Sequence, residues 1–249
     1  MRFALFSLIC RWIMDHRFLI DGLKELNIEA DERILGDFDT YYQILEEKNK
    51  VMNLTAISGE EDVSKLHFLD CIALTKYADL SGKKVIDIGS GAGFPGLPLN
   101  IVAPSMKLTM LDALAKRTAF LNELTEKLSV TNAEAVHMRA EEASLDKKMR
   151  DSYDFALSRA VARLSTLCEL CMPFVKVGGK FIAMKGTDSE EEINEAKNAI
   201  KILGGKIVTV EEYIIPTTDI IHRAVIIEKI SPTPKGYPRR FAKIQKSPL

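Results

Sequence analysis

The sequence predicts an α/β fold built on a mostly parallel sheet, and three observations carry this prediction. From Lys83 onward, short apolar strands alternate with helical segments, which is typical of parallel strands joined by right-handed crossovers. A glycine-rich loop, residues 89–96, joins the first of these strands to the next helix. The last two strands follow each other with no helix between them, which favours an antiparallel pair at the end of the sheet.

Seven strands are expected between residues 83 and 230. They are Lys84–Ile88, Lys107–Leu111, Ala135–Met138, Tyr153–Leu157, Phe181–Met184, Ile207–Ile215 and Ala224–Ile230. Helices are expected after the glycine loop as far as about Val102, and over residues 115–129, 141–149, 164–175 and 189–203, the last two closed by Gly178-Gly179 and Gly204-Gly205. Because ligands bind beyond the carboxyl ends of parallel strands, the residues that end each strand are the candidates for ligand contact.

Residues 14–82 are expected to form a helical cap packed on the main domain. Apolar residues from Ile34 to Leu45 recur at helical spacing, and Asp31 precedes them as a candidate N-cap. A second helix is expected over residues 63–77. Residues 231–249 form a basic C-terminal tail with five lysines and arginines and no acidic residue.

Residues 1–13 are expected to be an N-terminal extension outside the folded domain. The segment is apolar but short, Arg11 interrupts it, and no small-residue cleavage site follows, so neither a signal peptide nor a membrane span is expected. Ordinary amphipathic sequence begins at Met14, which leaves Met1 and Met14 as alternative starts.

Composition narrows the class of protein. A chain of 249 residues with 47% hydrophobic and 28% charged residues suits one globular α/β domain with additions. The net charge of −1 means that binding to a nucleic acid would depend on a local basic patch. Four cysteines indicate a reducing compartment, and the cytoplasm is expected. Cys168 and Cys171 form a single C-x-x-C in a predicted helix, which favours helix thiols over a metal or redox site, and no metal site is expected.

The run Asp87-Ile88-Gly89-Ser90-Gly91-Ala92-Gly93-Phe94-Pro95-Gly96 is the strongest functional signal. It lies between a strand and a helix, where glycines let the backbone turn sharply and approach a nucleotide. Asp112 ends the second strand about 20 residues further on, where an acid hydrogen-bonds ribose hydroxyls. This pattern leaves NAD and S-adenosylmethionine as alternative cofactors. Asp87 before the glycines and the antiparallel last strands resemble methyltransferases, in which such an acid helps to hold the methionine amino group.

The remaining strand ends supply further candidates. Ala140 and Glu141 follow the third strand, where they could contact adenine, although helix capping by Glu141 is an equal alternative. Arg159 and Lys185 end the fourth and fifth strands and are expected to point toward the cleft. Because no acid–base constellation is visible, the catalytic residue stays unknown. A nucleophile with a free lone pair, such as guanine N7, would need mainly positioning.

Taken together, the motifs resemble the bacterial RsmG family, also called glucose-inhibited division protein B. The motifs are DIGSGAGFPGLP at residues 87–98, Leu111-Asp112-Ala113 with Lys116-Arg117, Ser158-Arg159-Ala160, Lys185-Gly186, residues 53–57 (NLTAI), residues 67–70 (HFLD), Pro238-Arg239-Arg240 and Pro248-Leu249. The resemblance covers residues 14–249. It implies a Rossmann-like class I methyltransferase fold and an S-adenosylmethionine-dependent enzyme that methylates N7 of one guanosine in 16S ribosomal RNA.

The resemblance and the glycine loop together give a set of expected site residues. The expected cofactor-binding residues are Gly89, Gly91, Gly93, Phe94, Asp112, Ala140, Glu141 and Arg159. The expected RNA-binding residues are Lys116, Arg117, Arg163, Lys185, Arg239 and Arg240. The basic residues would neutralise phosphates and make RNA binding strongly salt-dependent.

Two other functions remain open from the sequence. One is an NAD-dependent oxidoreductase, and the other is a non-catalytic RNA-binding assembly factor. The preferred interpretation is a monomeric enzyme whose partner is 16S ribosomal RNA or the small ribosomal subunit, without membrane or DNA binding.

Overall fold

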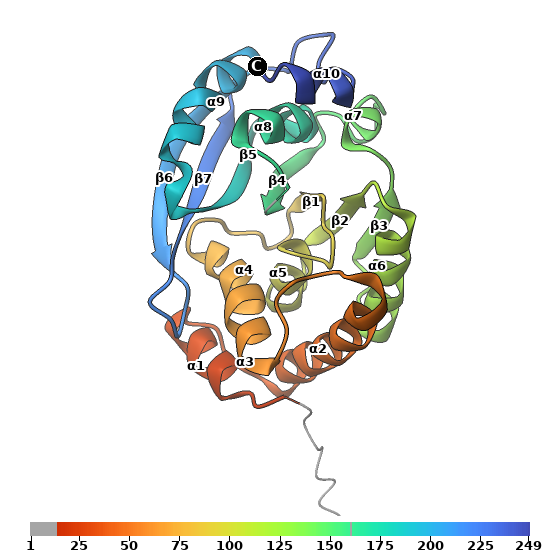
Figure 1. Cartoon of the computed structure of the whole chain (residues 1–249), viewed down its shortest axis with the longest axis vertical. Coiled ribbons are helices and arrows are strands. Elements are labelled where there is room, and N and C mark those ends of the chain that lie inside the picture. The colour runs from red at the N-terminus through yellow and green to blue at the C-terminus, as the bar shows by residue number, and fades with distance from the viewer. Residues whose placement is uncertain (1–13, 160) are drawn as a thin grey trace, which may run out of the picture.

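A mixed sheet organises the chain, and the strand order is β3-β2-β1-β4-β5-β7-β6 in the computed structural model (Figure 1). The structure describes residues 14–159 and 161–249, so the expected extension at residues 1–13 lies outside the described residues. In the described ranges, the strands are β1 (Lys84–Ile88), β2 (Lys107–Asp112), β3 (Ala133–His137), β4 (Tyr153–Arg159), β5 (Val175–Gly186), β6 (Gly205–Ile214) and β7 (Ile221–Lys229). Each matches an expected strand, and the largest difference is the longer β5.

Five neighbouring strands, β3, β2, β1, β4 and β5, are parallel. The last strand, β7, runs antiparallel between β5 and β6, as the sequence predicts. Ile88 of β1 pairs with Leu111 of β2, and Asp87 pairs with Leu157 of β4. This register brings the carboxyl ends of the parallel strands, and the loops that follow them, to one edge of the sheet.

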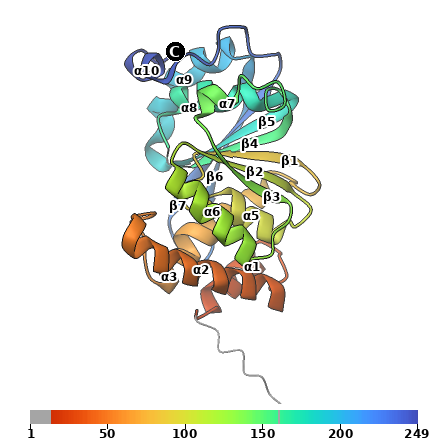
Figure 2. The same ribbon diagram turned by 90° about the vertical axis from the view of Figure 1, so that its right-hand side faces the viewer.

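Helices cover both faces of the sheet (Figure 2). The helices are α1 (Arg17–Glu25), α2 (Glu32–Met52), α3 (Glu60–Asp62), α4 (Asp70–Ile72), α5 (Gly96–Val102), α6 (Ala115–Lys127), α7 (Ala140–Ala143), α8 (Leu164–Cys171), α9 (Glu190–Ile202) and α10 (Phe241–Lys246). The first six lie on one face and the last four on the other. Adjacent β1 residues point to opposite faces, so Val85 belongs to one buried cluster and Ile86 to the other.

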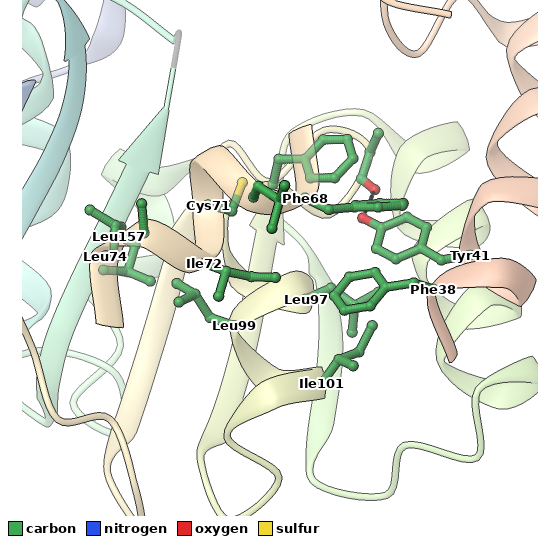
Figure 3. Packing of buried hydrophobic residues seen from close by; sticks show 14 of the residues in the cluster. Phe38, Tyr41, Phe68, Cys71, Ile72, Leu74, Leu97, Leu99, Ile101 and Leu157 are labelled. Atoms are coloured by element: carbon green, nitrogen blue, oxygen red, sulfur yellow. Dashed lines mark hydrogen bonds between the residues drawn. The ribbon is translucent and has the colours of Figure 1, made fainter. Parts of the chain in front are cut away.

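The N-terminal helical region shares its core with the sheet domain. Asp31 caps α2 by accepting the Ile34 N–H at 2.7 Å, which confirms the expected cap. Further along α2, Phe38 and Tyr41 are fully buried and pack against Phe68, with ring centroids 4.7 and 5.1 Å apart (Figure 3). The region is therefore continuous with the main core.

Three expected helices differ from the structure. The segment 164–175 leaves the α-helical form after Cys171, and Gly178-Gly179 lies inside β5 rather than closing the helix. The reason is a register shift between β4 and β5, where Gly179 comes so close to β4 that a Cβ would lie 2.6 Å from the Asp154 carbonyl oxygen. The expected helix at 141–149 is a single turn, and the helix expected at 63–77 contains a π-helical stretch at Val63–Leu69.

The C-x-x-C cysteines are buried core thiols. Cys168 and Cys171 are free and fully buried, and burial raises the pKa of both thiols, which keeps them protonated and unreactive. Within the described residues, no group of histidine, cysteine or acidic side chains could hold a metal ion. None of the described helices is long and apolar enough to cross a membrane.

Candidate active site

A cavity of about 550 Å³ opens at the carboxyl edge of the parallel strands. The loops after β1, β2, β3 and β4 line it, together with the N-terminal region and the start of α10. The lining residues are Leu54, Thr55, His67, Ile88, Gly89, Ser90, Gly91, Ala92, Phe94, Leu111, Asp112, Ala113, Leu114, Arg117, Met138, Arg139, Ala140, Glu141, Arg159, Val161, Leu170 and Phe241. Its volume falls in the range of roughly 300–1,000 Å³ that is usual for cofactor sites.

The glycine loop forms the floor of this cavity. Gly89 has a φ of +73°, and a Cβ there would lie 2.7 Å from a methyl carbon of Val161. Gly91 also has a positive φ, +58°, and lines the cavity. Gly93, expected as a cofactor residue, does not line it. A Cβ on Gly93 would lie 2.5 Å from the Tyr41 hydroxyl, so the packing of the helical cap requires this glycine.

Asp112 stands beside the loop at the end of β2. One carboxylate oxygen accepts the Gly91 N–H at 3.0 Å, and the other accepts the Leu114 N–H at 2.9 Å. Arg117 lies 3.5 Å from the carboxylate. Each oxygen keeps a lone pair for a ligand hydroxyl, which fits the expected contact with ribose.

Asp87, expected to help hold the methionine amino group, does not reach the cavity. Its side chain is fully buried, and one oxygen accepts the N–H of Gly96 at 3.0 Å. The other oxygen has no hydrogen-bond partner among the described residues. Burial raises the pKa of Asp87 to about 7. A Cβ on Gly96 would lie 2.9 Å from the carboxylate, so this glycine allows the close approach.

The far end of the cavity is formed after β3. Ala140 and Glu141 line it beside Met138, where the chain turns into the short helix α7. The Glu141 side chain makes no capping hydrogen bond, because the N-cap residue is Arg139 and α7 has no side-chain cap. Both expected residues therefore face the cavity over β3.

Arg159 forms the opposite end and is fixed by a buried network. One terminal nitrogen donates to Asp70 and to the Leu66 carbonyl oxygen, both at 3.0 Å. The other nitrogen donates to His67 at 2.7 Å. Asp70 also accepts from Tyr213 and His222, which joins the cap to the sheet. These donors lower the pKa of Asp70 despite its burial.

Phe94 lies against this network. The His67 ring stacks on it with centroids 4.3 Å apart, and the Arg159 guanidinium lies 4.8 Å from its centroid. Burial, reinforced by the adjacent Arg159, lowers the pKa of His67 to about 3, so the imidazole is neutral at physiological pH.

Sequence reasoning missed three lining residues of the N-terminal region as site residues: Leu54, Thr55 and His67. They belong to the two upstream motifs, residues 53–57 and 67–70, which the resemblance included without a role. No local pattern signals their function, because they reach the site only when the cap packs against the glycine loop.

The expected RNA-binding residues are dispersed. Lys116 is exposed and reaches the Met52 carbonyl oxygen at 3.4 Å, and Arg117 lines the cavity. Arg163 is exposed and pairs with Glu195 outside the cavity lining. The expectation that Lys185 points into the cleft is not met, since it pairs with Glu192 at 2.6 Å and donates to the Ala162 carbonyl oxygen.

The two tail arginines differ from each other. Arg239 donates three side-chain hydrogen bonds to the fully buried Glu169, between 2.6 and 3.2 Å long. Arg240 is exposed at the start of α10. Because Ile244 is fully buried, the tail is a packed element and not a free arm.

A family model described as rRNA small subunit methyltransferase G matches residues 34–221. Proteins named ribosomal RNA small subunit methyltransferase G are similar to almost the whole chain. The one from Acetivibrio thermocellus is 44% identical, over 94% of this chain and 96% of its own length. The one from Alkaliphilus metalliredigens is 46% identical, over 93% and 97%. This chain belongs to the rRNA small subunit methyltransferase G family.

Solved structures confirm the predicted fold. A SAM-dependent methyltransferase from Aquifex aeolicus matches 68% of this chain and 93% of its own, with a TM-score of 0.52 and 16% identity. M. jannaschii TYW2 in complex with AdoMet matches 65% and 75%, with a TM-score of 0.51 and 15% identity. Family membership confirms the predicted methyltransferase activity and its cofactor, S-adenosylmethionine, and it does not favour an oxidoreductase.

Proposed function

We propose that this enzyme transfers a methyl group from S-adenosylmethionine to N7 of one guanosine in 16S ribosomal RNA. The observation that carries the proposal is a cavity floored by the glycine loop, whose described lining residues hold no pair of side chains placed as general acid and general base. The only histidine in the lining, His67, is neutral and bonded on both nitrogens within the described residues. Such a site suits a nucleophile that loses no proton, and guanine N7 is one.

The residues that line the cavity support the following proposed position of the cofactor. The adenine would lie by Ala140 and Glu141, the ribose hydroxyls would bond to Asp112, and Gly89 and Gly91 would let the backbone approach the methionine part. Arg159 and Phe94 would then stand at the methyl-donor end. Gly93 leaves room behind the loop for the Tyr41 hydroxyl, which donates to the Ala92 carbonyl oxygen at 2.6 Å.

The chemistry needs positioning more than proton transfer. S-adenosylmethionine supplies a methyl group activated by a sulfonium, and the N7 lone pair forms the new bond as the carbon–sulfur electron pair returns to sulfur. The buried Asp70–Arg159–His67 network fixes one wall of the site, so little reorganisation is needed during the reaction.

The RNA must present its base in an accessible form. N7 lies in the deep, narrow major groove of an A-form helix, so the target guanine would be in a loop or turned out of its stack. Exposed basic residues near the site, including Lys116, Arg163 and Arg240, would contact phosphates. Lys185 and Arg239 would contribute indirectly, because their ion pairs with Glu192 and Glu169 hold neighbouring elements in position.

The proposal includes a role for each part of the chain. Residues 14–82 would act as a cap, 83–230 as the cofactor-binding domain and 231–249 as a packed basic tail. The enzyme would work as a monomer on ribosomal RNA or the small subunit in the cytoplasm, with no part in DNA or membrane binding.

Transfer of labelled methyl groups tests the proposal. Purified enzyme is incubated with labelled S-adenosylmethionine and with 16S RNA or small subunits from cells that lack this gene, and the modified base is mapped. A single 7-methylguanosine is expected. Gly91→Val should abolish cofactor binding and transfer, while a non-catalytic assembly factor would keep its RNA affinity in this variant. Tight cofactor binding without transfer to either RNA form would refute the proposed substrate.

A further inference from the structure

Thr55 is one of two polar residues that the N-terminal region contributes to the described lining of the cavity, the other being His67. Thr55 follows α2 in a loop, and Asn49 of α2 holds its backbone from both sides. The Asn49 side-chain amide donates to the Thr55 carbonyl oxygen at 2.9 Å, and the Thr55 N–H donates to the Asn49 side-chain oxygen at 3.0 Å. The backbone from which the Thr55 hydroxyl projects is therefore held in place in the cavity wall.

The neighbouring His67 has a defined tautomer. An arginine guanidinium has only donors, so the 2.7 Å contact from Arg159 makes His67 Nδ1 an acceptor. A neutral imidazole then carries its proton on Nε2, which lies 2.7 Å from the Thr55 hydroxyl oxygen. His67 Nε2 consequently donates to Thr55. The low pKa of His67 means that this arrangement persists across the physiological pH range.

The Thr55 hydroxyl oxygen has a second donor. The Ile57 N–H donates to it at 3.0 Å, so both lone pairs of the oxygen are filled. In the described part of the chain, no acceptor is hydrogen-bonded to the remaining hydroxyl proton. A threonine hydroxyl can usually both donate and accept hydrogen bonds. Because both lone pairs of the Thr55 hydroxyl are occupied, it can only donate to a ligand.

The position of Thr55 points to the target base. The strand order puts Glu141 over β3, Asp112 over β2 and Gly89 over β1, so the methyl-donor end lies toward β4 and Arg159. Thr55 lines this end through its bond to His67. If the carboxylate of the cofactor lies at this end, the charged Arg159 guanidinium is a stronger hydrogen-bond partner for it than the neutral Thr55 hydroxyl is. The Thr55 hydroxyl then remains available to a carbonyl group of the base.

We propose that the Thr55 hydroxyl donates a hydrogen bond to O6 of the target guanine, and that Arg159 and His67 restrict it to that donor role. The inference rests on the proposed function, which it deepens by naming a residue that selects the base. O6 is the acceptor next to N7 in guanine, whereas adenine carries an amino donor at that position. A donor-only hydroxyl pairs with guanine and leaves adenine facing a second donor.

The experiment replaces one group on the base and one on the protein. 16S RNA is assembled by ligation with guanosine or with 2,6-diaminopurine riboside at the target position, because the latter keeps N7 and changes O6 to an amino group. Rates of methyl transfer (kcat/KM) are measured for the wild type, Thr55→Val and Thr55→Ser. The affinity of each protein for S-adenosylmethionine is measured by calorimetry.

The wild type is expected to prefer guanosine by roughly 10- to 100-fold, as for a lost hydrogen bond that leaves unpaired polar groups. Thr55→Val should lose most of this preference while it binds S-adenosylmethionine as the wild type does. Thr55→Ser should restore the preference. His67→Asn keeps the hydroxyl but removes its defined donor, so it should also reduce the preference, and it serves if Thr55→Val fails to fold.

Two results would overturn the inference. If Thr55→Val binds S-adenosylmethionine more weakly and keeps the base preference, the hydroxyl faces the cofactor. If neither quantity changes, Thr55 selects nothing. Failure of the wild type to methylate guanosine in 16S RNA would instead refute the proposed function, so the two failures are distinguishable.

Discussion

At the scale of single residues, Gly89 shows why the loop needs glycine at one particular place. Its positive φ disfavours any side chain by about 1–2 kcal/mol. Its second constraint is steric, because a Cβ would meet Val161 at the cavity wall. The positive φ affects the stability of the fold, whereas the contact with Val161 affects the shape of the site. A second glycine with a similar φ but no neighbour near its Cβ can therefore separate the two effects.

We expect Gly89→Ala to weaken S-adenosylmethionine binding about tenfold or more, which corresponds to roughly 1.4 kcal/mol. Gly82→Ala is the control, because Gly82 has a similar φ of +69° but open space around its Cβ and no place in the cavity. Both variants should lose stability from the positive φ, Gly89→Ala somewhat more because its Cβ would meet Val161, and calorimetric titration should show weaker binding only for Gly89→Ala. Equal affinities for the two variants would contradict this account.

The buried carboxyl of Asp87 makes stability depend on pH. Burial raises its pKa from 3.8 to about 7, so the folded protein holds the proton more tightly than the unfolded chain does. The contribution of Asp87 to stability is therefore present below about pH 4 and is lost as pH rises through 7.

Asp87→Asn removes this titration. Relative to the wild type, its free energy of unfolding should rise by a few kcal/mol between pH 4 and pH 8, at about 1.4 kcal/mol per pKa unit. The measurement is denaturant unfolding of both proteins at several pH values, without cofactor. The contributions of the other titrating groups cancel in the difference between the two free energies of unfolding. A difference that is flat with pH would show that Asp87 ionises normally.

At the scale of elements, the C-terminal tail is a structural part of the site. Phe241, the first residue of α10, lines the cavity, and Arg239 just before it is bonded to buried Glu169 of α8. The sequence predicts a basic tail here, with Arg239 and Arg240 as RNA-binding residues. The structure shows that the Arg239–Glu169 ion pair and the buried Ile244 attach the tail to the sheet domain, while Arg240 stays exposed.

Arg239→Ala should leave the buried Glu169 carboxylate with the backbone N–H of residue 239 but without its charged partner, which costs about 3–5 kcal/mol. For a chain of this size, we expect the melting temperature to fall by roughly 10 °C. Lys246→Ala, at an exposed position at the end of α10, should change it little. Scanning calorimetry checks both variants, and similar melting temperatures would show that the Arg239–Glu169 pair contributes nothing.

At the scale of the whole molecule, the charge balance matters for RNA. With a net charge of −1, the protein offers no general attraction to a polyanion, so affinity must come from side chains near the cavity. Lys116 is exposed at the carboxyl edge of the sheet. Lys107 is equally exposed, but it begins β2 at the opposite edge.

Lys116→Ala should weaken RNA binding and reduce the slope of log K against log salt concentration by about 0.7–0.9, the value for one lost phosphate contact. Lys107→Ala carries the same change of charge and should leave the slope unaltered. Binding to 16S RNA measured over a series of salt concentrations tests the pair. Equal slopes for the two variants would indicate a purely global effect of charge.

Much of the fold was predictable because its signals are local. The apolar strands, the glycine loop and Asp112 at the end of β2 all lie where the pattern of the sequence puts them. The sequence predictions are wrong where a distant contact overrides local preference. Gly178-Gly179, for example, is expected from the sequence to end a helix but lies in β5, which pairs with β4.

The sequence by itself determined the sheet, the family and the glycine loop at the cavity floor, because strand periodicity and glycine spacing are properties of consecutive residues. Only the tertiary structure decided the opposite wall, where His67 meets Arg159 across 92 residues of chain and fixes the Thr55 hydroxyl. It likewise decided that Lys185 and Arg239 are held in ion pairs. Such pairings depend on which buried charges meet when the cap, sheet and tail pack together, and no local pattern encodes that.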